Sequence, residues 1–116
     1  MNKAEDIEIF RRLQEASLRQ NTSLTLAHKQ FYIRLLCYAI THGEDVENGI
    51  AIKVFMRDMG EITDFSPRMS EIAIKNLVAC GALKREKSLS RKEAFSTIFI
   101  KEFYEDNKRR KRNESI

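Results

Sequence analysis

The fold of this chain is decided by one continuous stretch, SPRMSEIAIKNLVACGALKRE at residues 66–86 followed by KSLSRKEAFSTIFIKEF at residues 87–103. Ser66 is a favoured helix cap, and Pro67 suits the first helical position, where a missing N–H group costs nothing. Helical spacing continues until Gly81, a residue that readily ends a helix in the left-handed conformation. The first half of the stretch therefore predicts one capped helix.

A helical wheel divides this helix into an apolar face and an open face. The apolar face, which we expect to be buried, comprises Met69, Ala73, Leu77 and Cys80, with Ser70 and Ile74 beside it. The open face comprises Arg68, Glu71, Ile72, Lys75 and Ala79. The helix is thus expected to pack on one side and to show charged groups to solvent on the other.

The second half of the stretch predicts a basic β-hairpin. Residues 83–87 and 94–103 read as strands, and the polar residues 88–93 read as the turn between them. Apolar groups occupy both faces of the second strand, so we expect it to be more buried, and more protected from solvent, than the first strand.

Two longer helices are predicted nearer the N-terminus. Residues 3–20 form an amphipathic pattern, and the apolar side chains at near-helical spacing are Ile7, Phe10, Leu13 and Leu18, with Ile9 and Ala16. Residues 25–42 are more apolar, so we expect this second helix to be the central one. Thr25 can cap it, and Gly43 is expected to end it as a left-handed stop.

Shorter elements are predicted between the central helix and the capped helix. Residues 44–49 read as an acidic loop, for which solvation is favoured over a cation site. Residues 50–52 are short, apolar and β-prone, whereas residues 53–60 show helical spacing and end on Gly60. We therefore expect one small strand and a short third helix, followed by a turn at residues 61–65.

The fold class predicted from this order is α+β, mainly helical with a small β-sheet. We expect one domain over residues 1–104, with its core over residues 24–103 and residues 3–20 as an extra N-terminal helix. Residues 105–116 are expected to be a basic disordered tail. A chain of 116 residues suffices for one core, and 42% hydrophobic with 33% charged residues is typical of a globular protein.

Several functional classes are disfavoured by the sequence. The longest apolar run, Leu35–Ile40, is far too short to span a bilayer, and the N-terminus is unlike a signal peptide, so we expect a cytoplasmic protein. Cys37 and Cys80 lack metal-ligand spacing and are expected to be buried thiols. His28 and His42 are too far apart on one helix to share a site. We therefore expect no enzyme activity, metal, cofactor or small-molecule ligand.

Charge is distributed unevenly along the chain. Residues 1–65 hold eight Lys and Arg against ten Asp and Glu, whereas residues 66–116 hold thirteen against seven. Five of those cations lie in the run Lys108–Arg112. This asymmetry favours a polyanionic partner for the C-terminal half.

The segments SPRMS and IKNL within residues 66–77, followed by GALKRE at residues 81–86, resemble the winged helix-turn-helix superfamily of DNA-binding proteins. Within it, the chain is similar to small regulators of plasmids, phages and conjugative elements and to the DNA-binding domains of replication initiators. The resemblance covers about residues 24–103 and implies a winged helix-turn-helix fold with an extra N-terminal helix. It implies a recognition helix at about residues 66–80 in the major groove and a basic wing at residues 84–93 on the backbone.

The resemblance implies a set of DNA-binding residues on the recognition helix. Arg68 can fork onto a guanine or clamp a phosphate, and Lys75 is better placed for a backbone phosphate. Ser66 and Ser70 can donate hydrogen bonds to phosphates, and the free N–H groups at the helix start also favour an anion.

Three more residues of this helix leave alternatives open. Glu71 either accepts from a cytosine or, as we favour, supports Lys75 four residues later as an ion-pair partner. Ile72 either contacts a thymine methyl group or packs inside the fold. Asn76 is expected to hydrogen-bond locally rather than to read an adenine.

The hairpin and the tail carry the remaining candidate cations. In the hairpin, the candidates for phosphate contacts are Lys84, Arg85, Lys87, Arg91 and Lys92, and the alternative is a hairpin kept soluble by its charge. In the tail, the candidates are Lys108, Arg109, Arg110, Lys111 and Arg112. The tail is expected to be either a flexible arm that adds phosphate contacts, an import signal or an inert segment.

The leading hypothesis is a sequence-preferring double-stranded DNA-binding protein, either a transcriptional regulator or an origin-binding accessory protein of a mobile element. One short recognition helix offers few base contacts, so a homodimer on two half-sites is expected. The N-terminal helix either supplies that dimer contact through Ile7, Phe10 and Leu13 or packs on its own domain. The alternative function is a protein–protein adaptor in a replication or DNA-transfer complex. RNA binding is disfavoured because no exposed aromatic platform is evident.

Overall fold

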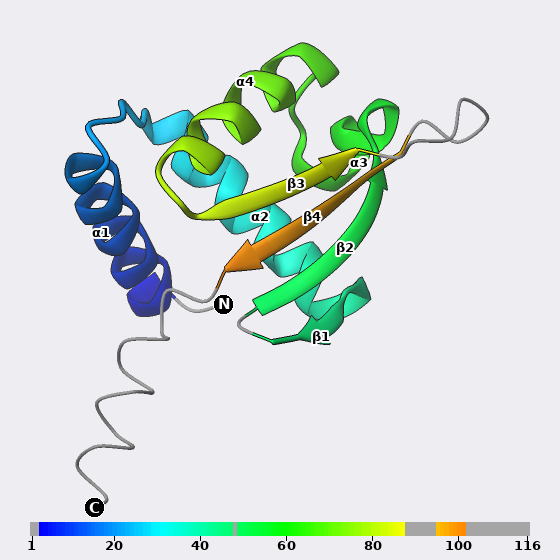
Figure 1. Cartoon of the computed structure of the whole chain (residues 1–116), viewed down its shortest axis with the longest axis horizontal. Coiled ribbons are helices and arrows are strands. Elements are labelled where there is room, and N and C mark those ends of the chain that lie inside the picture. Colours follow the sequence, from blue (N-terminus) through cyan, green and yellow to red (C-terminus); the bar gives the residue numbers. More distant parts are fainter. Residues whose placement is uncertain (1–2, 48, 88–94, 102–116) are drawn as a thin grey trace, which may run out of the picture.

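The computed structural model describes residues 3–47, 49–87 and 95–101. Its helices are α1 (Lys3–Arg19), α2 (Leu26–His42), α3 (Met59–Thr63), which follows the 3₁₀ turn η1 (Met56–Asp58), and α4 (Pro67–Ala79). Its strands are β1 (Glu44–Val46), β2 (Gly49–Phe55), β3 (Leu83–Lys87) and β4 (Phe95–Lys101). The architecture is mixed α+β, as predicted, with a small antiparallel sheet beside the helices (Figure 1).

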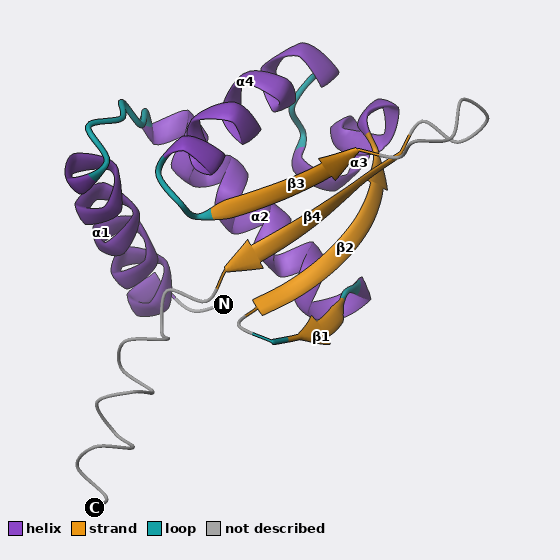
Figure 2. Ribbon diagram, in the orientation of Figure 1, coloured by secondary structure: helices purple, strands orange, loops and turns teal. Residues whose placement is uncertain are grey.

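The sheet has the strand order β1-β2-β4-β3, with every pairing antiparallel. Strand β4 therefore lies inside the sheet, where Ile98 pairs with Ile52 of β2 and with Arg85 of β3. Ser96, Ile98 and Ile100 of β4 are buried, whereas Thr97 and Phe99 are partly exposed. Figure 2 shows the helices on one side of this sheet, with α2 running behind it.

Helix α2 is the central helix, as predicted. The side chain of Thr25 accepts a hydrogen bond from the backbone N–H of His28 and so caps the helix as expected. The side chains of Phe31 and Leu35 are fully buried, and the helix contacts α1, α3, α4 and β2. The other elements of the hydrophobic core therefore pack around α2.

The predicted left-handed stop at Gly43 is wrong, because this glycine is extended, with φ −87° and ψ 174°. Glycine is needed here because there is no room for a side chain. A Cβ atom there would lie 2.5 Å from Cγ2 of Ile50 and 2.6 Å from the carbonyl oxygen of Ala39. The glycine is required because α2 and β2 approach each other closely where the chain turns from helix to sheet.

The elements between α2 and α4 differ from the prediction in three places. Residues 44–46 are not a loop but the edge strand β1, and residues 53–55 extend β2 instead of starting a helix. Pairing explains the longer strand, because β2 follows β4 as far as the pair Phe55 and Phe95. Gly60 lies inside α3, and the left-handed residue that ends this helix is Asp64, with φ 64°.

The predicted apolar stripe of α1 is only partly buried. Ile9, Leu13 and Ala16 pack into or against the core, whereas Ile7 and Leu18 are exposed. The helix is therefore held against its own domain, which was one of the two alternatives for it.

Some predictions fall outside the described residues. These are the turn of the wing at residues 88–93, the two ends of the second hairpin strand at residues 94 and 102–103, and the tail at residues 105–116. Within the described ranges, no helix combines the length and apolar character needed to cross a membrane.

Replacing Gly43 with alanine should destabilise the fold by about 1–3 kcal/mol, because the added methyl group would overpack the contact with Ile50 and Ala39. Urea denaturation measures this change. The matched control is Gly60→Ala. A Cβ atom at Gly60 meets nothing nearer than 3.9 Å, so this variant should be neutral or slightly more stable. Equal losses in the two variants would contradict the packing argument.

Candidate nucleic-acid interface

The start and end of α4 follow from local sequence signals. The hydroxyl oxygen of Ser66 accepts a hydrogen bond from the backbone N–H of Met69 at 3.2 Å, and Pro67 occupies the first turn. Gly81 follows the helix with φ +86°, a conformation that other residues rarely adopt. The predicted helix is therefore confirmed at both ends.

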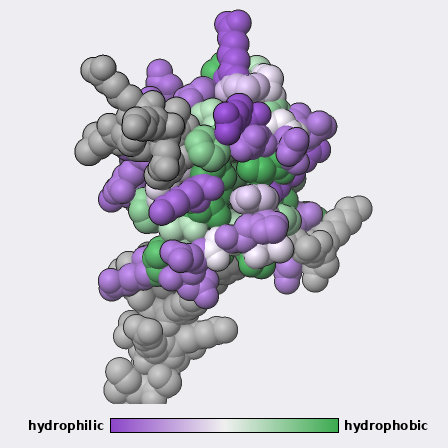
Figure 3. All heavy atoms as spheres, turned by 90° about the vertical axis from the view of Figure 1, so that its right-hand side faces the viewer, coloured by the Kyte–Doolittle hydropathy of each residue, from purple (hydrophilic) through white to green (hydrophobic). Residues whose placement is uncertain are grey.

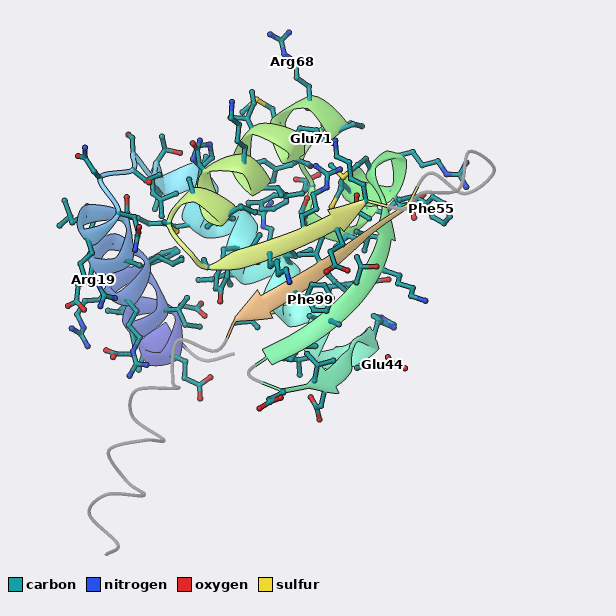
Figure 4. The ribbon with its side chains drawn as sticks, viewed as in Figure 1. Arg19, Glu44, Phe55, Arg68, Glu71 and Phe99 are labelled. Atoms are coloured by element: carbon teal, nitrogen blue, oxygen red, sulfur yellow. The ribbon has the colours of Figure 1, made fainter. Side chains whose placement is uncertain are left out.

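One side of α4 is left open to solvent. The side chains that face the core are Ser70, Ala73, Ile74 and Leu77. Helical periodicity places the opposite residues in one line, and all four are exposed; we call Arg68, Ile72, Lys75 and Ala79 the outer ridge. In Figure 4 the side chain of Arg68 extends from α4 away from the sheet. The ridge thus joins two cations to one large apolar side chain.

Two predictions for residues of α4 are wrong: the phosphate contact of Ser70 and the burial of Met69. Ser70 is fully buried and donates a hydrogen bond to the carbonyl oxygen of Phe65, so it cannot serve as a phosphate contact. Met69 is exposed rather than buried. The physical reason is that α4 packs against both α2 and β3. Its buried face is turned toward the sheet relative to the face that the apolar side chains alone suggest.

Glu71 is paired with Arg85 of β3, not with Lys75 as predicted. The two Nη atoms of Arg85 donate to the two carboxylate oxygens of Glu71 at 2.6 and 3.0 Å, and Nε donates to the hydroxyl of Ser96 at 2.9 Å. The side chain of Arg85 is only 14% exposed. Arg85 therefore ties α4 to β3 and β4 and is not available for a phosphate, which corrects its predicted role.

This ion pair lowers the pKa of Glu71. The hydrogen bonds from Arg85 are the largest cause, and the positive charges of Arg85 and Lys87 add to them, while partial burial acts in the opposite direction. Glu71 is the only acidic residue of α4. The negative charge of Glu71 is therefore offset by Arg85 and Lys87, which both belong to β3.

The other cations of β3 remain at the surface. Lys84 lies 3.6 Å from Glu86 and its ammonium stands 5.7 Å from the ring centre of Phe99, while Lys87 is exposed. Lys87 lies on the same face of β3 as Arg85 and joins the candidate interface as a surface charge beside α4. Lys84 lies on the opposite face of the sheet, with Phe99, because successive side chains of a strand alternate between the two faces. The remaining cations predicted for the site lie outside the described residues: Arg91, Lys92, Lys108, Arg109, Arg110, Lys111 and Arg112.

A groove of about 380 Å³ separates the outer ridge from β3. It is lined by Glu71, Ile72, Ile74, Lys75, Val78 and Arg85. Its surface is mainly apolar, and the ion pair of Glu71 with Arg85 lies along one side. Ile72 lines the groove and also belongs to the outer ridge, so a partner could contact its side chain from either surface.

Asn76 lies on the other flank of α4 and is turned toward the domain. Its amide nitrogen lies 3.5 Å from Nδ1 of His28, which is buried. Burial lowers the pKa of His28. Asn76 therefore contacts α2 rather than a neighbour in sequence, which differs from the local hydrogen bond that was predicted, and it does not belong to the outer ridge.

A second depression, of about 880 Å³, lies where α2, β2 and α3 meet. Its lining mixes apolar side chains with charges of both signs: Arg34, Lys53, Asp58 and Glu61. Cys37 also lines it and is exposed, so the expectation that both thiols are buried holds only for Cys80. Figure 3, which shows the side of the molecule carrying α3, has apolar atoms at its centre within a rim of hydrophilic side chains.

Among the residues the structure describes, no group of three or more His, Cys, Asp or Glu side chains could hold a metal ion. Comparison with known proteins gives no match: no protein-family model, no curated protein and no solved structure matches the chain. The site must therefore be interpreted from its own geometry.

Replacing Glu71 with glutamine should destabilise the fold at pH 7 by about 1 kcal/mol or less, because it removes a charge-assisted contact to a largely buried arginine. The folded-state pKa of Glu71 is lowered, so its stabilisation is complete well above pH 4.5 and is lost as the pH falls through the folded-state value. The stability difference between the wild type and the variant should accordingly shrink below about pH 4.5. Urea denaturation at a series of pH values measures it.

Glu86→Gln is the matched control, because it removes the same charge from an exposed pair with Lys84. It should cost only a few tenths of a kcal/mol at any pH. A stability loss from Glu71→Gln that did not depend on pH would contradict the ionic role of this contact.

Proposed function

We propose that the chain is a double-stranded DNA-binding protein of the winged helix-turn-helix type, with α4 as the helix that enters the major groove. The observation that carries the proposal is the outer ridge, which presents Arg68, Ile72 and Lys75 to solvent while the one acid of α4 is held by Arg85. An exposed helix with cations and an apolar group suits a groove lined by base edges and flanked by phosphates.

The order of elements supports this proposal. From α2 onward the chain runs helix, strand, short helix, α4, strand and strand, and β4 lies between β2 and β3. This is the order that the resemblance to winged helix-turn-helix proteins implies. The turn between α3 and α4 is short, with Asp64 in the left-handed conformation. Helix α1 and strand β1 are additions to that order.

Phosphate contacts would come from both elements of the interface. On α4, Ser66 is exposed at the helix start, where free backbone N–H groups favour an anion. On β3, Lys87 is exposed next to the same helix, whereas Lys84 is exposed on the opposite face of the sheet, where it could contact a phosphate only from the wing side. The wing and the tail would add the cations that the sequence places there.

In the cell, we propose a sequence-preferring regulator of transcription or an origin-binding accessory protein of a mobile element. A single short helix reads few base pairs, so useful specificity calls for two half-sites and a homodimer. The dimer contact first expected from Ile7, Phe10 and Leu13 is revised, because Leu13 is buried within its own domain. Ile7 and Leu18 are exposed and lie eleven residues apart on one side of α1, which suits them to that role.

Removing Arg68 and Lys75 together by alanine substitution should weaken binding to any duplex and should flatten the dependence of affinity on salt. Each phosphate contact contributes about 0.9 to the slope of log K against log salt, so the slope should fall by up to about 2. Fluorescence anisotropy with a labelled duplex from 50 to 200 mM salt measures this change.

The control is Arg19→Ala with Lys53→Ala, which removes the same charge from exposed positions on α1 and β2. Its slope should stay close to that of the wild type. If duplex DNA is not bound at near-physiological salt, or if the two double variants lose the same affinity, the proposal is wrong. A protein adaptor would then be the better explanation, since it requires neither steep salt dependence nor the outer ridge.

Replacing Ile7 and Leu18 together by serine should shift a homodimer toward monomer without unfolding it, because both side chains are exposed on α1. Light scattering coupled to size-exclusion chromatography gives the mass, and circular dichroism checks the fold. Leu26→Ser is the control, since Leu26 is equally exposed but begins α2. A dimer that persists unchanged would exclude α1 as its interface.

A further inference from the structure

We propose that Ile72 is a specificity-determining residue that recognises the 5-methyl group of thymine in the major groove. This inference rests on the proposed DNA-binding function. It begins from the position of Ile72 near the middle of the outer ridge, between Arg68 and Lys75, where its side chain is 41% exposed.

The side chain at this position lies outside the hydrophobic core, although it lines the groove beside α4. The packing of α4 is completed by Ala73, Ile74 and Leu77, which are all buried on the opposite side of the helix. A β-branched residue on an exposed helix face is slightly unfavourable compared with alanine, because it loses side-chain freedom. An apolar side chain that is exposed and not needed for packing is available for an intermolecular contact.

The surroundings of Ile72 favour a base edge over a phosphate or a generic apolar partner. Cations stand four residues before it and three residues after it, which corresponds to about 6 Å and 4.5 Å along the helix axis. Base pairs are about 3.4 Å apart, so Arg68 and Ile72 could contact bases within about two steps of each other. Thymine presents a methyl group in the major groove that an apolar side chain can contact, while the cations on either side of it can contact neighbouring base edges or phosphates.

Glu71 does not interfere with this contact. It is adjacent to Ile72 in sequence, but its carboxylate is directed to Arg85, with both oxygens bonded at 2.6 and 3.0 Å. A free carboxylate at this point would repel phosphates and could accept from cytosine. Because Arg85 occupies it, the apolar surface of Ile72 and the cations beside it dominate the ridge.

The experiment begins with selection of preferred duplexes from a random pool by the wild-type protein, where a thymine should be enriched in each half-site. Each selected thymine is then replaced singly by deoxyuridine, which removes only the methyl group. At one position per half-site, affinity should fall about fourfold, the factor expected from burial of one methyl-sized group. The Ile72→Ala variant should bind thymine and deoxyuridine duplexes equally.

Two control variants separate this contact from general binding. Val78→Ala removes a similarly exposed apolar side chain at the edge of the ridge, and it should keep the discrimination between thymine and deoxyuridine. Arg68→Ala should also keep it, while lowering affinity for both duplexes. Ile72→Ala should leave the salt slope unchanged, since no charge is lost.

The possible failures are distinguishable. If the wild type binds no duplex, the proposed DNA-binding function fails, and the inference fails with it. If the wild type binds but selects no thymine, or if no deoxyuridine substitution weakens binding, the inference alone is overturned. It is also overturned if Ile72→Ala weakens both duplexes equally and keeps the discrimination, since the side chain would then act without contacting the methyl group.

Discussion

The burial of α2 is the constraint on which the rest of the structure depends. Phe31 and Leu35 are fully buried, and α2 contacts α1, α3, α4 and β2. Ala73 and Leu77 of α4 belong to the same core as these side chains. Because exposing them would forfeit about 1.5–3 kcal/mol for a leucine-sized group, α4 cannot easily rotate about its axis. The direction of its outer ridge is therefore set by the core, far from the surface that the ridge presents.

Elements whose signals are local could be predicted from the sequence. The cap at Ser66 bonds a backbone N–H three residues later, and the cap at Thr25 does the same. The left-handed stop at Gly81 likewise needs no distant partner. Strand β3 was predicted with its observed bounds because Gly81 and the polar turn delimit it on both sides. Hydrogen bonds between neighbours in sequence can be predicted from the residue types at those positions.

Elements that depend on distant partners could not be predicted in the same way. Residues 53–55 suit a helix by their spacing, and they form a strand because residues of β4 that lie forty or more positions later pair with them. Gly43 has a typical position for a helix stop, and only the approach of Ile50 reveals that space is its real constraint. At the site, Ser70 was assigned to a phosphate because it lies near the start of α4, although its place beside the apolar face agrees with the burial that the structure shows.

The ion pair of Glu71 with Arg85 illustrates why charges alone could not define the interface. From residue types alone, Glu71 should repel an anion and Arg85 should attract one. Because the two side chains hydrogen-bond each other, neither contributes strongly to anion binding. A partly buried fork of this kind is held by hydrogen bonds as well as by charge, so a phosphate would have to displace a well-placed carboxylate to reach Arg85. The useful potential at the surface therefore comes from Arg68 and Lys75, which have no such partner among the described contacts of α4. A nearly neutral domain can in this way present a cationic helix, because the one acid of α4 is neutralised by an arginine of β3 while its two cations stay exposed.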